Sequence, residues 1–283
     1  MLDILTEPFE LAFMQRAFLA AGFAAVACAV VGTYVVLKGL GFMGDAIAHS
    51  SLTGMAAAVA LGGNVLWGAL AWVFPASLAI TFISRNTRLL MDTSIGIVYA
   101  AGFSIGLIIL SFEPNYTRDL LHFLFGNVVD VSWGEVIAIG AVAGAVLAVV
   151  LLLFKELTFT AYDDTMASAS GVPVRAIQYL LPLLIGITTV AALKTVGIVL
   201  VLSLLVTPAA TARLLVTRLA NIMGAAVVLA LASVVAGLHL AFHLDTPPGP
   251  TIVLVSTGLF VLTLVFSPSR GLIKRRRRRA ADL

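Results

Sequence analysis

Long apolar runs separated by short polar segments constrain the fold of this chain more than any other feature. A helix of about 20 apolar residues crosses the ~30 Å hydrocarbon core of a bilayer, where helices and closed barrels alone satisfy their backbone groups. Of the 283 residues, 61% are hydrophobic and 11% are charged, whereas soluble domains carry about 25% charged residues. The sequence therefore predicts an all-α integral membrane protein, a polytopic helical bundle of eight or nine transmembrane helices.

Nine segments of the chain have the length and composition of a span. They are 12–37, 41–62, 66–84, 91–111, 134–154, 177–193, 196–212, 221–242 and 251–269. The pair 177–193 and 196–212 is short, and Lys194 and Gly197 near its junction mark either a turn between two spans or a break within one helix. Nine spans place the two termini on opposite sides of the membrane, and eight place them on the same side.

The positions of Lys and Arg indicate the orientation, because cytoplasmic loops are enriched in both. With nine spans and a cytoplasmic C-terminus, fourteen of the 17 Lys and Arg residues are cytoplasmic. Six of them form the run KRRRRR within the tail 270–283, which we interpret as an anchor on lipid headgroups and not as a nucleic-acid site. We expect residues 1–283 to form a single transmembrane domain, with residues 1–11 as an interfacial segment.

An Asp and a His occur inside the second run, where ionisable side chains are costly and mark functional sites. Asp45 and His49 are four residues apart and share one helix face. A carboxylate with an imidazole suits manganese, iron or zinc, whereas calcium and magnesium prefer oxygen ligands. A symmetric dimer with this helix at its axis would supply two Asp and two His. The alternative is a local Asp45–His49 hydrogen bond that caps the helix after the turn GLGFMG.

Small residues recur at every fourth position of the same run. They are Ala46, Ser50, Gly54, Ala58 and Gly62. Such a ridge allows another helix to approach closely. We therefore expect the second run to lie in a packed interior and not against lipid.

Polar residues also gather in two predicted extracytoplasmic groups and in one long cytoplasmic loop. The outer groups are Glu113, His122, Asp130 and Glu135, and His239, His243 and Asp245 in GLHLAFHLD. Each group either attracts a cation at the outer mouth or consists of scattered interfacial residues. The cytoplasmic loop 155–178 fits a short amphipathic helix that ends at Gly171.

Motifs of enzyme chemistry are absent from the sequence. There is no GxxxxGK[ST] phosphate loop, no HExxH and no CxxC, and the single Cys28 excludes an internal disulfide. We therefore expect a chain that is not an enzyme and that has no intrinsic cofactor.

Several motifs together resemble one family of transporters. They are VGTYVVLKGLGFMGDAIAHSSLTG (31–54), SIGIVYAAGFSIGL (94–107), HFLFGNVVDVSW (122–133), YDDTMASASGVP (162–173), VGIVLVLSLLVTPAATARLL (196–215) and LDTPPGPTIVL (244–254). The chain resembles, over nearly its whole length, the membrane permease subunits of ATP-binding-cassette importers for zinc, manganese and iron.

This resemblance implies a type II importer permease of the bacterial cytoplasmic membrane that carries a divalent manganese, zinc or iron ion. It implies a second permease copy, identical or paralogous, two cytosolic ATPase subunits that hydrolyse ATP, and an extracytoplasmic metal-binding protein. It assigns Asp45 and His49 as metal ligands. It also assigns the loop 156–176, through Asp163, Ala167 and Gly171, as the part that couples to the ATPase.

The sequence departs from the family pattern at two places. His239 and His243 stand where we expect apolar or aromatic residues, which leaves open a role in metal access, and the Arg-rich tail is not a family feature. Two other functions stay open. One is a permease for a bulky chelate of the siderophore or cobalamin type, although such a pathway would not need the charged pair Asp45 and His49. The other is a metal transporter that works without ATP.

Overall fold

The computed structural model describes residues 11–112 and 131–267, which fold into twelve helices without a strand. Eight of these helices are long and apolar enough to cross a membrane. They are α2 (Ala12–Lys38), α5 (Val65–Asn86), α6 (Met91–Ser111), α8 (Trp133–Leu152), α11 (Val174–Val196), α12 (Ile198–Leu215), α13 (Leu219–Leu244) and α14 (Pro248–Phe266). The predicted class, a polytopic all-α membrane protein, is confirmed.

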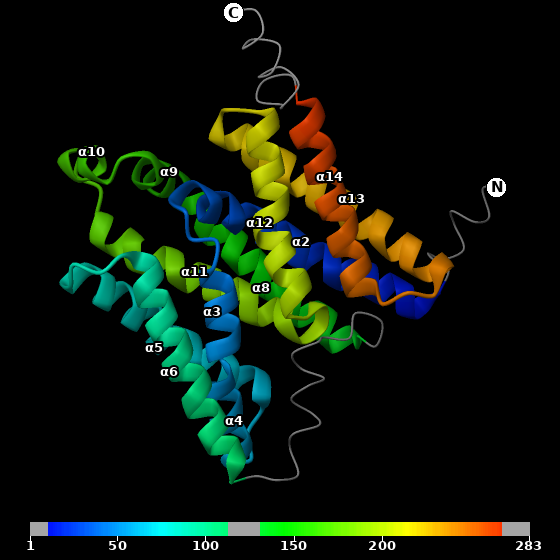
Figure 1. Ribbon diagram of the computed structural model, residues 1–283, viewed down its shortest axis with the longest axis horizontal. Helices are drawn as coiled ribbons and strands as arrows, with labels where there is room; N and C mark the ends of the chain where they lie inside the picture. The colour runs from blue at the N-terminus through cyan, green and yellow to red at the C-terminus, as the bar shows by residue number, and fades with distance from the viewer. Residues whose placement is uncertain (1–10, 113–130, 268–283) are drawn as a thin grey trace, which may run out of the picture.

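The second apolar run forms two short helices, α3 (Met43–Ser50) and α4 (Leu52–Ala60), which are separated at Ser51. Figure 1 shows that α4 continues in the direction of α3. The hydroxyls of Ser50 and Ser51 donate to carbonyls three residues earlier, at 3.1 and 2.6 Å, and such back-bonding bends helices. The two helices together are about 27 Å long at 1.5 Å per residue, so we interpret them as a ninth crossing.

Gly197 forms the junction between α11 and α12. Its φ of 80° and ψ of 161° lie in a backbone region that glycine alone adopts without strain. The two helices diverge from this point in Figure 1. The segments 177–193 and 196–212 are therefore two helices joined by a sharp turn, and not one broken span.

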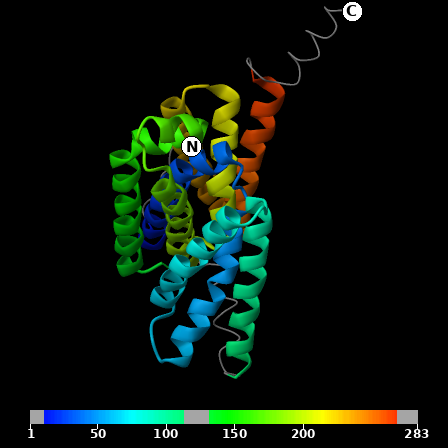
Figure 2. The same cartoon turned by 90° about the vertical axis from the view of Figure 1, so that its left-hand side faces the viewer.

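The centre of the bundle is formed by α2 and α11, which are the most buried of the long helices, whereas α14 is the least buried. The helix α4, the start of α5 and the end of α6 project together at the end of the molecule opposite α9 and α10 (Figures 1 and 2). The chain thus has two ends of different character, one made by this projecting group and one by the short helices α9 and α10.

The short helices α9 (Phe154–Tyr162) and α10 (Asp164–Ala169) connect α8 to α11. After α10 the chain passes through Ser170 to Gly171, whose φ is 84°. A short helix is thus present as expected, but it ends at Ala169, two residues before Gly171, and a second short helix, α9, precedes it. The predicted interfacial segment 1–11 and the basic tail 270–283 lie, apart from residue 11, outside the described residues.

Candidate metal site and coupling helix

Asp45 lies in the first turn of α3 but does not cap it. The cap position is Phe42, and no side chain accepts a hydrogen bond from the backbone there. The capping part of the alternative is therefore wrong, but the local contact between Asp45 and His49 that it also predicts is present.

The partner of Asp45 is His49, one turn further along α3. His49 Nε2 lies 3.4 Å from Asp45 Oδ1. Two ligand atoms that are each 2.0–2.2 Å from one ion lie about 3.3–3.6 Å apart at a tetrahedral angle. The spacing of these two atoms therefore suits the coordination shell of a single transition-metal ion without any movement of α3.

Two aromatic rings of α6 orient the His49 imidazole. Tyr99 and Phe103 both meet it edge-on, with ring centroids 5.7 and 6.0 Å away, and they stack on each other. Rings of this kind reduce the rotamers that a side chain samples, which is what a preorganised ligand needs.

Small residues bring α6 close enough to provide these rings. A Cβ on Gly102 would lie 2.7 Å from Ser50 Cβ, and a Cβ on Gly106 would lie 2.8 Å from the backbone of Leu52. The Thr53 hydroxyl donates to the Gly102 carbonyl and joins the helices directly. The ridge predicted on the second run is confirmed in its central part, where Ser50 packs on α6 and Gly54 packs on Gly68 of α5.

The pair is not enclosed by this chain. The side chains of Asp45 and His49 are 32% and 28% exposed. Among the residues that the structure describes, no group of three His, Cys, Asp or Glu side chains gathers to hold a metal. Within the described residues, the pair therefore lies on a partly exposed face of α3 without a third ligand side chain beside it.

The structure describes some residues of the two predicted extracytoplasmic groups and not others. His239 and His243 meet at the end of α13, with their Nε2 atoms 3.3 Å apart. Glu135 completes a capping box with Ser132 at the start of α8. The predicted residues Glu113, His122 and Asp130 lie outside the described residues.

The three residues assigned to coupling each shape α10. Asp163 caps the helix, because its Oδ1 accepts hydrogen bonds from the backbone N–H groups of Thr165 and Met166, both at 2.9 Å. Ala167 is fully buried, and its carbonyl accepts from Val172 N at 3.0 Å across the turn at Gly171. The three residues thus define the conformation of α10, and of the three only Ala167 is buried, whereas Asp163 and Gly171 are exposed.

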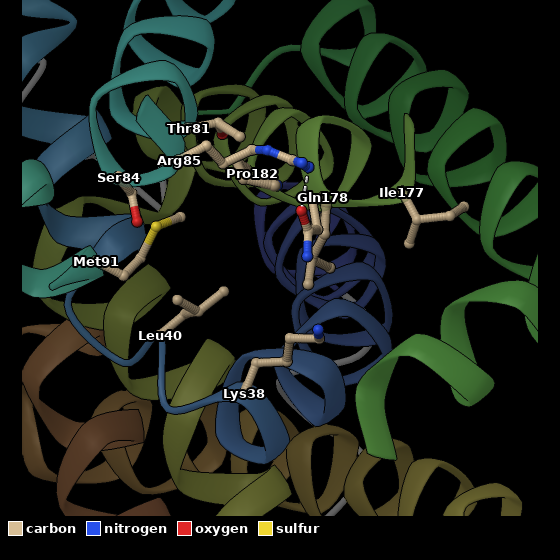
Figure 3. Close-up of a pocket in the computed structure, with 10 residues that line it drawn as sticks. Lys38, Leu40, Thr81, Ser84, Arg85, Met91, Ile177, Gln178 and Pro182 are labelled. Atoms are coloured by element: carbon tan, nitrogen blue, oxygen red, sulfur yellow. Dashed lines mark hydrogen bonds between the residues drawn. The ribbon is translucent and has the colours of Figure 1, made fainter. Parts of the chain in front are cut away.

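The sequence analysis missed a polar chain that connects α10 to three spans. Lys38 Nζ lies 3.0 and 3.3 Å from the two oxygens of Asp164, and Gln178 Nε2 donates to the same carboxylate at 3.0 Å. Arg85 Nη1 in turn donates to Gln178 Oε1 (Figure 3). Asp164 therefore connects α10 to the end of α2, to α11 and, through Gln178, to α5.

A cavity of about 230 Å³ lies beside this polar chain (Figure 3). It is lined by Lys38, Leu40, Thr81, Ser84, Arg85, Met91, Ile177, Gln178, Leu181 and Pro182. These residues come from the end of α2 and the turn after it, from the second half of α5, from the start of α6 and from the first half of α11. The helix ends next to α10 are therefore separated by open space and are joined by a few polar contacts.

Comparison with known proteins gives consistent matches over nearly the whole chain. The model of the ABC 3 transport family matches residues 10–267. The manganese transport system membrane protein MntC of Halalkalibacterium halodurans is 38% identical over 273 residues, 96% of this chain and 94% of that protein. The chelated iron transport system membrane protein YfeD of Yersinia pestis is 34% identical, over 94% of this chain and 89% of that protein.

A solved structure matches as well. It is PsaBC from Streptococcus pneumoniae in complex with Fab, with a TM-score of 0.85 and 30% identity, covering 98% of this chain and 100% of the matched chain. The fold described above is thus shared with a chain of that complex.

Proposed function

The chain belongs to the ABC 3 transport family, and on that premise we propose that it is the permease subunit of an ATP-driven importer of divalent transition metal ions. The observation that carries the proposal is the contact between Asp45 and His49 within a membrane-crossing run. Ionisable side chains within a span are costly and are a functional-site hypothesis by default. Manganese is the first candidate and iron the second, since the names of MntC and YfeD mention these metals.

The complete metal site would form between two copies of the chain. A second Asp45 and His49 across a symmetry axis would give two carboxylates and two imidazoles around one ion. The two carboxylates offset the double charge of the ion, which matters most in a low-dielectric interior. The imidazoles must be neutral to bind the metal, so protonation of His49 would release it. A site exposed on one side in each subunit fits transient binding, which transport requires.

The ion would pass from an extracytoplasmic binding protein to the cytoplasm. In this orientation, the ends of α2 and α5 that carry Lys38 and Arg85 face the cytoplasm together with α10, and so does the C-terminus. The common location of these groups at one end of the bundle supports the orientation.

Coupling to ATP hydrolysis would run through α9 and α10. A cytosolic ATPase subunit would dock on their exposed surface, where Tyr162 and Met166 are 60% and 59% exposed. Movement of α10 would be transmitted by Asp164 to α2 and α11, next to a cavity that leaves room for the helix ends to shift.

The test is uptake of radiolabelled manganese by proteoliposomes that contain the permease, with its ATPase and binding protein supplied. We expect uptake that requires ATP and that falls to background in Asp45→Ala and His49→Ala. Asp92→Asn removes a carboxylate from the first turn of α6 and is the matched control, with normal uptake. Uptake without ATP would refute the ATP-driven importer. Normal uptake by both site variants would refute the metal site.

A further inference from the structure

The two histidines at the end of α13 form a pair that the proposed transport pathway does not use. His239 and His243 belong to the last two turns of the helix, which ends at Leu244. That helix starts directly after Arg218, a residue on the predicted cytoplasmic side. The pair therefore lies near the opposite, outer end of the span.

The geometry of the two rings is that of a bidentate metal ligand. Their Nε2 atoms lie 3.3 Å apart, and their centroids are 4.8 Å apart with the rings inclined at 67°. Two histidine nitrogens at 2.0–2.1 Å from one zinc ion are about 3.3–3.4 Å apart at a tetrahedral angle. At this distance the two rings share a hydrogen bond in which the donor depends on the tautomer. When both rings instead carry their proton on Nδ1, the same spacing lets both Nε2 atoms bind one cation.

The surroundings of the pair also favour a cation. The last carbonyls of a helix carry a partial negative charge, and Asp245 follows as the cap of α13. No Lys or Arg occurs between residues 219 and 266 of the sequence. The ring of Phe242 meets His243 edge-on at 5.4 Å, which holds that imidazole in place.

We propose that His239 and His243 form a second, outward-facing site for a divalent transition metal of the zinc, copper or nickel class. Two imidazoles without a carboxylate ligand suit these metals better than manganese, which prefers oxygen ligands. The pair supplies two ligands, and among the described residues no group of three His, Cys, Asp or Glu side chains gathers. This site is separate from Asp45 and His49 and goes beyond the proposed transport function.

The experiment measures zinc bound per chain by equilibrium dialysis of the purified full-length permease. The background is the variant Asp45→Ala/His49→Ala, so that the result does not depend on the transport site. We expect about one zinc per chain in this background and a loss of at least tenfold in affinity when His239→Ala or His243→Ala is added.

The matched control moves one imidazole and keeps the composition unchanged. In His243→Leu/Leu244→His the second ring shifts by one residue, about 100° around the helix, onto a position that is 60% exposed. We expect this variant to bind zinc as weakly as His243→Ala, with an unchanged elution volume in size-exclusion chromatography. Zinc binding that persists in it, or a background variant that binds no zinc, would overturn the proposal.

Discussion

Replacing Gly102 with Ala should disturb the metal pair through the helix that supports it. A Cβ at this position would lie 2.7 Å from Ser50 Cβ and 3.3 Å from Ser50 Cα. Carbon atoms in contact are ~3.5–4.0 Å apart, so α3 must move away from α6 by about 1 Å. The nearest atom is a Cβ held by its own backbone, so no rotamer change relieves the clash. Overpacking of this kind costs about 1–3 kcal/mol.

This displacement acts directly on the candidate ligands. His49 lies one residue before Ser50 and is oriented by Tyr99 and Phe103. Ligands must be held to within ~0.5 Å of their productive positions, so a shift of about 1 Å exceeds the tolerance. We expect manganese uptake to fall about tenfold or more, which corresponds to ~1.4 kcal/mol, in a protein that still assembles in the membrane.

The assay compares initial rates of ATP-dependent manganese uptake in proteoliposomes, together with the melting temperature in detergent. The control is Gly96→Ala on the same helix, where an added Cβ would meet no atom within 4 Å. We expect wild-type uptake from this control, and a lower melting temperature from Gly102→Ala alone. If Gly102→Ala transports and melts like Gly96→Ala, the close approach of α3 and α6 does not position the site.

Three further predictions concern the coupling end and the turn at Gly197. Asp164→Asn removes the charge that holds Lys38 and should raise the number of ATP molecules hydrolysed per manganese transported. The pair is partly exposed and ion pairs near the surface contribute about 0–1 kcal/mol, so the melting temperature should change little. An unchanged ratio of ATP hydrolysed to manganese transported would contradict the role of Asp164. Asp163→Ala removes the cap of α10, worth about 0.5–2 kcal/mol, and should impair transport, whereas Asp163→Asn keeps the cap and should transport. An equal loss of transport in both variants would show that the charge of Asp163 matters and not its role as a cap. Asp163→Lys should uncouple ATP hydrolysis from transport. Gly197→Ala should lower the amount of folded protein recovered from membranes, because alanine adopts the backbone conformation of this turn only with strain. Normal recovery would contradict the requirement for glycine at this position.

The spans were predictable because each depends on local composition alone. The apolar run 91–111 coincides with α6, and the other long helices begin and end within a few residues of their predicted bounds. The ridge on the second run was also predictable, since small residues at every fourth position indicate close packing whichever helix is the partner. The sequence did not reveal which helices pack on the ridge, because that depends on contacts between distant segments.

The candidate metal pair could be predicted from the sequence, whereas the polar chain around Asp164 could not. Asp45 and His49 are four residues apart, so the helix period alone placed them on one face. Lys38 and Asp164 are 126 residues apart in the sequence, and only the fold brings them together. Asp163 and Asp164 are adjacent in the sequence, and only the structure shows that the first caps α10 and the second reaches Lys38.

The central claim is that Asp45 and His49 bind the transported ion together. Its most direct test is a crystal structure of the full transporter complex grown with manganese, with anomalous diffraction recorded at the manganese absorption edge. We predict an anomalous peak between two copies of α3, at a bonding distance of about 2.0–2.6 Å from Asp45 Oδ1 and His49 Nε2 of each copy. A manganese peak elsewhere in the membrane-spanning region, with both of these atoms farther than ~4 Å from it, would contradict the account.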